Sequence, residues 1–439
     1  MKPTNIVLLY GAMALLLAVV GFGQSWDVAL GILNLCILSA IMALGVNMQW
    51  GYAGLFNSGV MGFAAVGGIA AIVVAQPPTV GAWEVGGVGI GIAFLIVLAT
   101  IALAVLVRRS VSQSLRTPAT IVILLIGYFS ASYFFEPATK AIESFDAART
   151  GYLGGLGLPI LLSWIVGAFF AAAVAWLIGK VALGLRADYF SIATLGIAEI
   201  ILVIIKNEVW LTRGVNNVTN FPRPVPTAME LAASPWFINF AGSLGANPSS
   251  LASIVSKLCY TVLFTAVLAV LMILAETALN SPWGRMMRAI RDNETAAKAM
   301  GKNVTARHLQ IFILGSAVAG IAGAMLVSLD GQFTPGSYNA LRYTFLIWVM
   351  VIVGGSGNNW GSILGAFLIW FVWIEAEPFG NWIVEVATRG LSPDSGLRDW
   401  MLNASPYMRV ILMGTILLVT LRFRPRGLIP ERNAQTTRH

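Results

Sequence analysis

The sequence is poor in the residues from which most soluble catalytic and metal sites are built. Only 10% of its 439 residues are charged, and it has two cysteines and two histidines. Soluble domains carry about 25% charged residues. Because Cys36 and Cys259 are far apart and each lies in an apolar run, we expect no disulfide framework, no thiolate metal site and no cofactor.

Motifs that bind nucleotides or activate a nucleophile are also missing. The sequence has no HExxH or GxSxG pattern, and neither histidine has a cluster partner. A P-loop needs a Gly-Lys pair followed by Ser or Thr, and neither Gly179-Lys180 nor Gly301-Lys302 is followed by one. We therefore expect that the chain is not an enzyme. If ATP drives its activity, another subunit binds the ATP.

Apolar residues dominate instead, at 58% of the chain with a mean hydropathy of +0.81. A helix needs roughly 20 apolar residues to cross a membrane. The runs expected to cross are 6–23, 28–49, 59–76, 86–107, 120–135, 159–179, 190–205, 258–275, 310–327 and 410–421. Two shorter runs, 343–353 and 362–374, predict a hairpin that does not cross fully. The fold class is therefore an all-α polytopic membrane helical bundle of about 10–12 segments in a single domain, 1–439.

The loop charges predict how this bundle is oriented. With the N-terminus inside, 17 of the 27 basic residues fall in inside loops and 13 of the 19 acidic residues fall outside. This asymmetry follows the positive-inside rule, so both termini are predicted to be cytoplasmic. It also accounts for the net charge of +8 without a nucleic-acid partner.

The most polar inside loop, residues 281–301, is predicted to form two short helices. Ser281 suits an N-cap with Pro282 as the first helical residue, and Asn293 can cap a second helix that begins at Glu294. Gly301 suits the left-handed position that ends a helix. Arginines at 285, 288 and 291 share one face.

The second of these helices has the surface of a docking element. Ala296 and Ala297 are small, and Met300 is an adaptable apolar residue. A short helix with such a face can insert into a groove of a partner protein. The alternative is a solvated loop with ordinary membrane-proximal arginines.

Glycines and isolated polar residues supply candidates for a substrate path. The stretch 51–54 followed by Gly62 resembles the stretch 354–357 followed by Gly365. Such stretches form either discontinuous membrane segments at a transport site or close helix packing. The substrate-path candidates are Asn57, Gly59, Thr194, Glu199, Gly354 and Gly357.

Glu199 is the one carboxylate inside a predicted span, and an intramembrane charge is a functional hypothesis by default. Substrate contact, proton handling and a structural hydrogen bond all stay open for it. A proton-coupled secondary transporter that uses Glu199 is accordingly a rival function, and a membrane scaffold without transport is another.

Several ordered motifs resemble one transport family. The stretch 295–301, TAAKAMG, resembles the coupling motif of ABC-importer permeases, with Thr295 at its acidic position. The chain more closely resembles LivM-type permease subunits of branched-chain amino acid ABC importers over residues 33–75 and 159–426. The resemblance rests on LRADYF at 185–190, TLGIAEI at 194–200, LTRG at 211–214, GGSG at 354–357 and RPRG at 424–427.

The resemblance implies a permease that transports branched-chain amino acids or related small polar solutes, with urea or short amides as the alternative. It implies three kinds of partner: a homologous LivH-type permease, two ATP-binding cassette subunits and an external substrate-binding protein. The expected location is the bacterial inner membrane, with a cytoplasmic coupling region at 276–307. Its ATPase-coupling residues are Glu294, Thr295, Ala296, Ala297, Met300 and Gly301.

The sequence departs from the family in two places. Residues 77–158 contain two spans beyond the common pattern, which predicts an insertion. Val60 stands where the family commonly has His or an aromatic residue, which leaves the substrate open.

Overall fold

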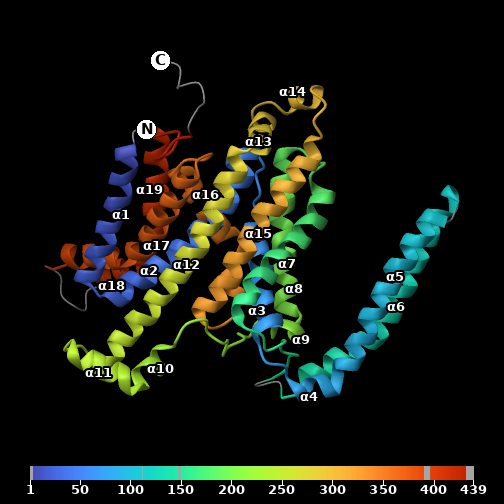
Figure 1. Cartoon of the computed structure of the whole chain (residues 1–439), viewed down its shortest axis with the longest axis horizontal. Coiled ribbons are helices and arrows are strands. Elements are labelled where there is room, and N and C mark those ends of the chain that lie inside the picture. The colour runs from blue at the N-terminus through green and yellow to red at the C-terminus, as the bar shows by residue number, and fades with distance from the viewer. Residues whose placement is uncertain (1–2, 111, 147–149, 390–395, 432–439) are drawn as a thin grey trace.

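The chain is a bundle of helices. A computed structural model describes residues 3–110, 112–146, 150–389 and 396–431. Within these residues the regular elements are helices, with one isolated β-bridge between Val218 and Phe333, and ten helices are long and apolar enough to cross a membrane. The predicted all-α polytopic membrane bundle is confirmed (Figure 1). Residues 432–439, predicted to be cytoplasmic, lie outside the described residues.

Ten candidate spans are built around the long helices α1 (Pro3–Gly23), α2 (Trp26–Val46), α5 (Val88–Ser110), α6 (Gln113–Ser144), α7 (Ile160–Ala182), α8 (Ala187–Asn207), α12 (Pro248–Asn280), α15 (Val304–Asp330), α17 (Asn359–Ala387) and α19 (Met408–Phe423). Two apolar helices are shorter, α3 (Val60–Ala75) and α16 (Ala340–Gly354). The remaining elements are η1 (Asn47–Gly51), α4 (Val80–Ala82), η2 (Trp83–Gly87), α9 (Val209–Thr212), α10 (Ala228–Ala233), α11 (Pro235–Ser243), α13 (Pro282–Asp292), α14 (Glu294–Ala299), η3 (Pro335–Tyr338), α18 (Gly396–Ala404) and η4 (Ser405–Tyr407).

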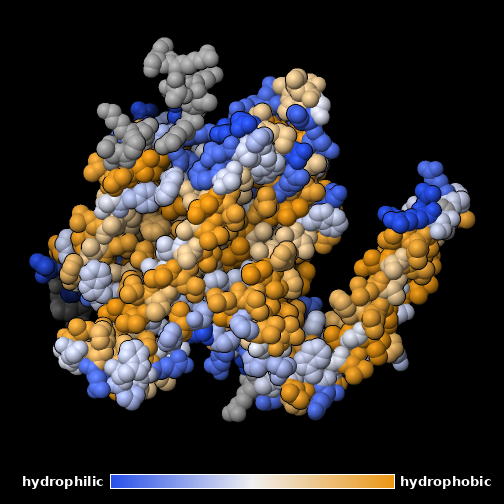
Figure 2. Space-filling view, in the orientation of Figure 1, coloured by the Kyte–Doolittle hydropathy of each residue, from blue (hydrophilic) through white to orange (hydrophobic). Residues whose placement is uncertain are grey.

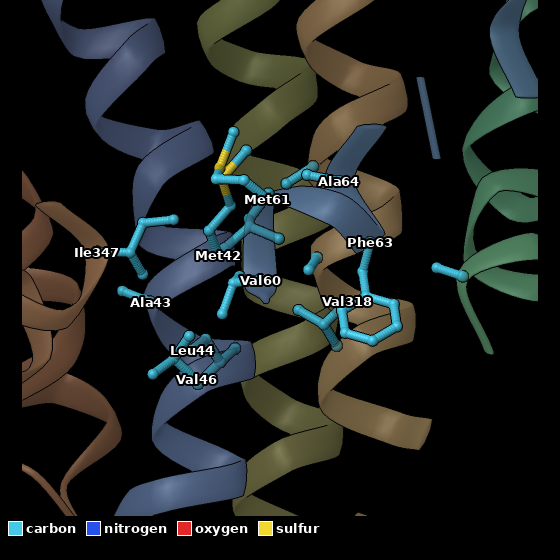
Figure 3. Close-up of a cluster of buried hydrophobic side chains, with 14 of the residues drawn as sticks. Met42, Ala43, Leu44, Val46, Val60, Met61, Phe63, Ala64, Val318 and Ile347 are labelled. Carbon is cyan, nitrogen blue, oxygen red and sulfur yellow. The ribbon is translucent and has the colours of Figure 1, made fainter. Parts of the chain in front are cut away.

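The centre of the bundle consists of α2, α3 and α15, which pack against α7, α16 and α17. Small residues let these helices approach closely, since a Cβ on Gly323 would lie 1.8 Å from the carbonyl oxygen of Ala64. Met42 on α2, Met61 on α3 and Val318 on α15 are buried together with Ile347 on α16 (Figure 3). The most buried spans, α2 and α15, are therefore held by close backbone contact as well as by apolar side chains.

The two ends of the bundle differ. The N-terminus, α13 and α14 lie at one end, which we call the α14 end, and α4, α10 and α11 lie at the other, which we call the α11 end (Figure 1). Polar residues gather around α13 and α14, whereas the sides of the bundle are apolar (Figure 2).

Helices α5 and α6 form a hairpin that stands apart from the rest of the bundle (Figure 1). They pack against each other through small residues; a Cβ on Gly127, for example, would lie 2.2 Å from the hydroxyl of Thr100. The hairpin meets the bundle near the α11 end, where the ring of Phe135 lies edge-on to Trp210 at 5.5 Å between centroids. Its outer faces are apolar over most of their length (Figure 2).

Two helices differ in length from the expectation. The run 362–374 is only the first part of α17, which has 29 residues, so the prediction of a second short arm is wrong. The helix continues through Pro378 into a segment that mixes acidic and apolar residues, and hydropathy alone does not register that continuation. In contrast, α3 has only 16 residues and residues 54–59 before it are not helical, so the run 59–76, expected to cross, is not among the ten candidate spans. Of the two arms expected at 343–374, α16 alone is short, with 15 residues.

Candidate functional site

The stretch 281–301 folds into two short helices. The hydroxyl of Ser281 accepts a hydrogen bond from the Trp283 backbone N–H at 3.2 Å and caps α13. Asn293 ends α13 and caps α14, because its Oδ1 accepts from the Ala296 backbone N–H at 2.9 Å. Gly301 follows with φ of +75°, a conformation that glycine adopts without strain. The local sequence therefore dictates both helix starts and the final turn.

Helix α14 presents a free surface. None of its residues is buried, and the Met300 side chain just after it is 79% exposed. Glu294 and Lys298 form an ion pair of 2.6 Å along its side. Ala297 is half-buried against the core, and no atom lies within 4 Å of a Cβ added to Gly301. The helix thus rests on the bundle through one residue and turns the others outward at the α14 end.

Helix α13, in contrast, is anchored. Its buried residues are Gly284, Met287 and Ile290, and a Cβ on Gly284 would lie 2.1 Å from the carbonyl oxygen of Leu279. The three arginines that share one face have different partners. Arg285 and Arg288 donate to carbonyl groups at the end of α12, whereas Arg291 reaches into the bundle.

Arg291 connects α13 to the end of η1 and to the C-terminal segment. Its guanidinium donates to the carbonyl oxygen of Gly51 and forms an ion pair with Glu431, with 3.0 Å between Nη1 and Oε2. Only 24% of the Arg291 side chain and 22% of the Glu431 side chain are exposed. Burial by itself lowers the pKa of Arg291, but Glu431 and Asp292 outweigh it and hold that pKa above its usual value. The Arg291 guanidinium therefore stays positively charged and joins α13 to η1 and to the C-terminal segment.

Asn47 lies where the two similar glycine stretches meet. Its Oδ1 accepts from the Gly357 backbone N–H and its Nδ2 donates to Oδ1 of Asn359, both at 2.8 Å. Asn359 in turn donates to Glu276 near the end of α12, at 3.0 Å. A Cβ on Gly51 would lie 2.4 Å from the Gly357 nitrogen. The stretches 51–54 and 354–357 therefore form one polar junction below α13.

A second polar group surrounds the non-helical loop before α3. Asn57 donates to Gln49 at 2.9 Å, accepts from the Gly59 backbone N–H at 2.9 Å, and its carbonyl accepts from the Trp348 indole at 3.0 Å. Gln49 donates to the carbonyl oxygen of Phe312 on α15 at 2.9 Å. Non-helical backbone inside a membrane protein is tolerated where protein groups satisfy it, as these side chains do here.

Among the predicted substrate-path residues, Asn57, Gly59 and Thr194 lie together. The Ser58 backbone N–H donates to the Thr194 hydroxyl at 3.1 Å, and a Cβ on Gly59 would lie 2.4 Å from the Thr194 carbonyl oxygen. Gly357 belongs to the junction around Asn47. Gly354 lies beside it, where α16 and α17 touch; a Cβ there would lie 2.0 Å from the Gly361 carbonyl oxygen.

Glu199 lies apart from both groups. Its side chain is exposed on the outer face of α8, near the middle of that 21-residue helix. Exposed apolar residues surround it on the same face, among them Ile192, Ile200 and Val203. Within the described part of the chain it forms no hydrogen bond or ion pair. The structure therefore gives this carboxylate no partner of its own.

Sequence reasoning missed most of the residues that join these elements. Gln49, Glu276, Asn359 and Glu431 each bridge two elements, but none is part of a motif. One available signal was their position, since amide and acidic residues at the edges of apolar runs need buried partners.

The comparisons with known proteins find transport permeases. A family profile described as "Branched-chain amino acid transport system / permease component" matches residues 129–421. The High-affinity branched-chain amino acid transport system permease protein LivM of Escherichia coli is 28% identical over 302 residues, which make up 67% of this chain and 63% of that protein. LivM of Salmonella typhimurium gives the same values. The chain thus spans less than two thirds of the length of these two relatives.

An archaeal relative aligns over more of the chain. The Probable branched-chain amino acid transport permease protein LivM of Methanocaldococcus jannaschii is 25% identical over 403 residues, which are 89% of this chain and 90% of that protein. No solved structure matches the chain.

Proposed function

Because the chain belongs to the family of permease components of branched-chain amino acid transport systems, we propose that it is the membrane-spanning subunit of an ATP-driven importer. Its substrates are branched-chain amino acids or related small polar solutes. It supplies a path through the membrane, and the ATP is hydrolysed on partner chains.

The observation that carries this proposal is the contrast between α14 and α13. A free helix at the α14 end, followed by an exposed methionine, is suited to a groove on an ATPase subunit. Directly before it, α13 is fixed to the bundle through Met287, Ile290 and Arg291. A movement of α14 therefore moves α13 as well, because no flexible loop separates the two helices.

The junction below α13 gives that movement a route to the spans. Arg291 contacts η1, and Asn47 in η1 holds Gly357 and Asn359. Element η1 lies in the connection between α2 and α3, and Gly357 and Asn359 lie where α16 is followed by α17. We propose that closure of the ATPase subunits shifts α13 against this junction and changes the packing of both helix pairs.

In the proposed assembly the α14 end faces the cytoplasm, where two ATP-binding cassette subunits bind. The excess of basic residues in the loops at that end supports this orientation. An external substrate-binding protein docks at the α11 end. Residues 77–158 are an insertion relative to the common fold, and 276–307 form the coupling region.

The position of Glu199 is an argument for a second permease as a partner of this chain. A carboxylate that faces lipid near the middle of a span costs about 2.5–3.5 kcal/mol on insertion scales. Within the described residues nothing relieves this cost. We propose that a homologous permease covers this face of α8 and donates a hydrogen bond to Glu199, so that the acid lies between the two permeases.

The experiment that tests the proposal replaces Met300 by Asp and measures whether the ATPase subunits copurify with the permease. Met229 is the matched control, because it has the same side chain, is 83% exposed and lies at the α11 end. We expect Met300→Asp to release the ATPase subunits and to abolish ATP-dependent uptake, and Met229→Asp to retain the ATPase subunits.

Retention of the ATPase subunits and of uptake by Met300→Asp would refute docking through α14. Uptake that collapses with the proton gradient and ignores ATP depletion would instead support a secondary transporter.

A further inference from the structure

A cavity of about 250 Å³ lies inside the bundle, between α2, α3, α15, α16 and α17. It is smaller than the roughly 300–1,000 Å³ typical of drug-sized ligands, so its size suits a molecule of a few heavy atoms. It lies apart from the junction at α13 and from the exposed face of α8. None of the residues singled out from the sequence lines it.

The inner part of the cavity is apolar. Met42 on α2 and Met61 on α3 lie close together there, and Ile347 on α16 faces the same region (Figure 3). Met61 is the second residue of α3 and follows the loop that Asn57 and Gly59 stabilise. Methionine side chains adapt to ligands of different shape, so this wall can accept linear and branched aliphatic groups.

The outer part carries charge. Asp330, the last residue of α15, lines the cavity and is exposed. Its carboxylate forms no hydrogen bond or ion pair with any described residue. It also sits at the C-terminal end of a 27-residue helix, where the backbone dipole adds negative potential. This corner of the cavity therefore favours a cation.

A buried indole and an exposed guanidinium lie near this end of the cavity, and the guanidinium, that of Arg223, already acts electrostatically on the Asp330 carboxylate. The indole N–H of Trp370 is buried in the cavity wall and has no hydrogen-bond partner among the described residues. The guanidinium of Arg223 lies against the residue after Asp330, since its Nη2 would be 2.9 Å from a Cβ on Gly331. Buried polar groups in folded proteins normally have partners, so an unpaired indole beside a cavity points to a ligand acceptor.

We propose that this cavity binds one α-amino acid with an aliphatic side chain during transport. The ammonium group pairs with Asp330, and the carboxylate accepts from Trp370 and is attracted by Arg223. The side chain lies against Met42, Met61 and Ile347. This inference rests on the proposed transport function and deepens it, because an ammonium-selective site admits amino acids and excludes urea and simple amides.

The test is equilibrium binding of radiolabelled leucine to the purified permease complex without ATP and without the external binding protein. We expect Asp330→Asn to weaken leucine binding about tenfold or more, because a charge-assisted hydrogen bond is lost. Asp399→Asn is the matched control, since Asp399 is exposed on α18 and does not line the cavity. It should bind leucine like the unaltered complex.

Competing ligands separate the ammonium contact from a general loss of structure. Leucinamide, which keeps the ammonium group, should displace leucine from the unaltered complex, and 4-methylpentanoate, which lacks it, should not. A second variant, Met61→Phe, narrows the apolar part. It should lose leucine while it still binds alanine, which shows that the protein remains folded.

Leucine binding by Asp330→Asn equal to that by Asp399→Asn overturns the assignment, and so does displacement of leucine by 4-methylpentanoate. Either result leaves ATP-dependent uptake and ATPase association intact, so the proposed transport function survives it. Loss of ATPase association in the Met300→Asp experiment has no bearing on binding in this cavity.

Discussion

Arg291 connects the α13–α14 region to the spans through its contacts with Gly51 and Glu431. Replacement of Arg291 by Gln leaves the Gly51 carbonyl unpaired, which costs about 1–3 kcal/mol. The ion pair with Glu431 is mostly buried, so its loss falls between the ~0–1 kcal/mol of a surface pair and the ~3–5 kcal/mol of a buried one, and adds about 1–2 kcal/mol. We therefore expect the docking of α13 to weaken by about 2–5 kcal/mol.

Arg291→Gln should reduce the coupling of uptake to ATP hydrolysis more than the assembly of the permease with its ATPase subunits. A change of that size lowers the equilibrium constant for docking of α13 by a factor of about 30 or more. In vesicles that contain the complete complex, we expect Arg291→Gln to retain the ATPase subunits, because α14 itself is unchanged. The number of substrate molecules taken up per ATP hydrolysed should fall about tenfold or more.

Arg285→Gln is the control, because Arg285 is exposed and donates to the Asn280 carbonyl on the neighbouring helix end. Equal uptake per ATP in the two variants would refute a coupling role for Arg291. The double variant with Glu431→Gln adds a further check. Because Arg291 and Glu431 share one contact, its effect should be smaller than the sum of the single effects.

Three further predictions concern the other polar and glycine positions. Glu199→Gln should lower uptake while the amount of folded permease in the membrane stays the same, as measured by transport and by detergent-solubilised yield; unchanged uptake would argue against an ionised role. Gly357→Val should lower the thermal unfolding temperature strongly, because Gly357 has φ of +79° and a Cβ would lie 2.9 Å from Glu431. Gly91→Val, at a position with open space around it, should leave that temperature nearly unchanged. Asn47→Leu should destabilise the fold by about 2–4 kcal/mol in the same measurement, since Gly357 and Asn359 lose buried partners.

The helical bundle itself could be predicted because each span carries its own signal. Apolar length and loop charge identify most crossings, and the caps at Ser281 and Asn293 are encoded by adjacent residues. The length of α17 could not be predicted in the same way. Its second half mixes acidic residues and Pro378 with apolar ones, and whether such residues continue the helix depends on the neighbours that pack against it.

The positions of the candidate residues depended on long-range contacts. Asn57, Gly59 and Thr194 come together because Ser58 reaches across to α8, a contact between positions 136 residues apart. The similarity of the two glycine stretches was visible in the sequence, but their meeting at Asn47 was not. Glu199 stood out by its charge, yet hydropathy does not report which face of a helix a residue occupies.

The cavity next to Asp330 could not be predicted from the sequence for a related reason. Its residues are distributed over five α-helices and the short element η3, and each of them alone has an ordinary structural explanation. Asp330 reads as the end of a span and Trp370 as a core aromatic. Only their common position, with a carboxylate and an indole N–H that has no hydrogen-bond partner among the described residues on one cavity, distinguishes them.

The most direct test of the central claim is a cross-link from the end of α14. Cys36 is buried and Cys259 is half-buried, so the background reactivity of the chain is low. Met300→Cys places a reactive thiol at a position that is 79% exposed in the isolated chain. In membranes that contain the whole complex, we expect a thiol-directed cross-linker to join it to an ATPase subunit, and Met229→Cys not to react with that subunit. Free modification of Met300→Cys by a soluble thiol reagent in the complete complex, without any cross-link to an ATPase subunit, would contradict the claim that α14 is where this permease is driven.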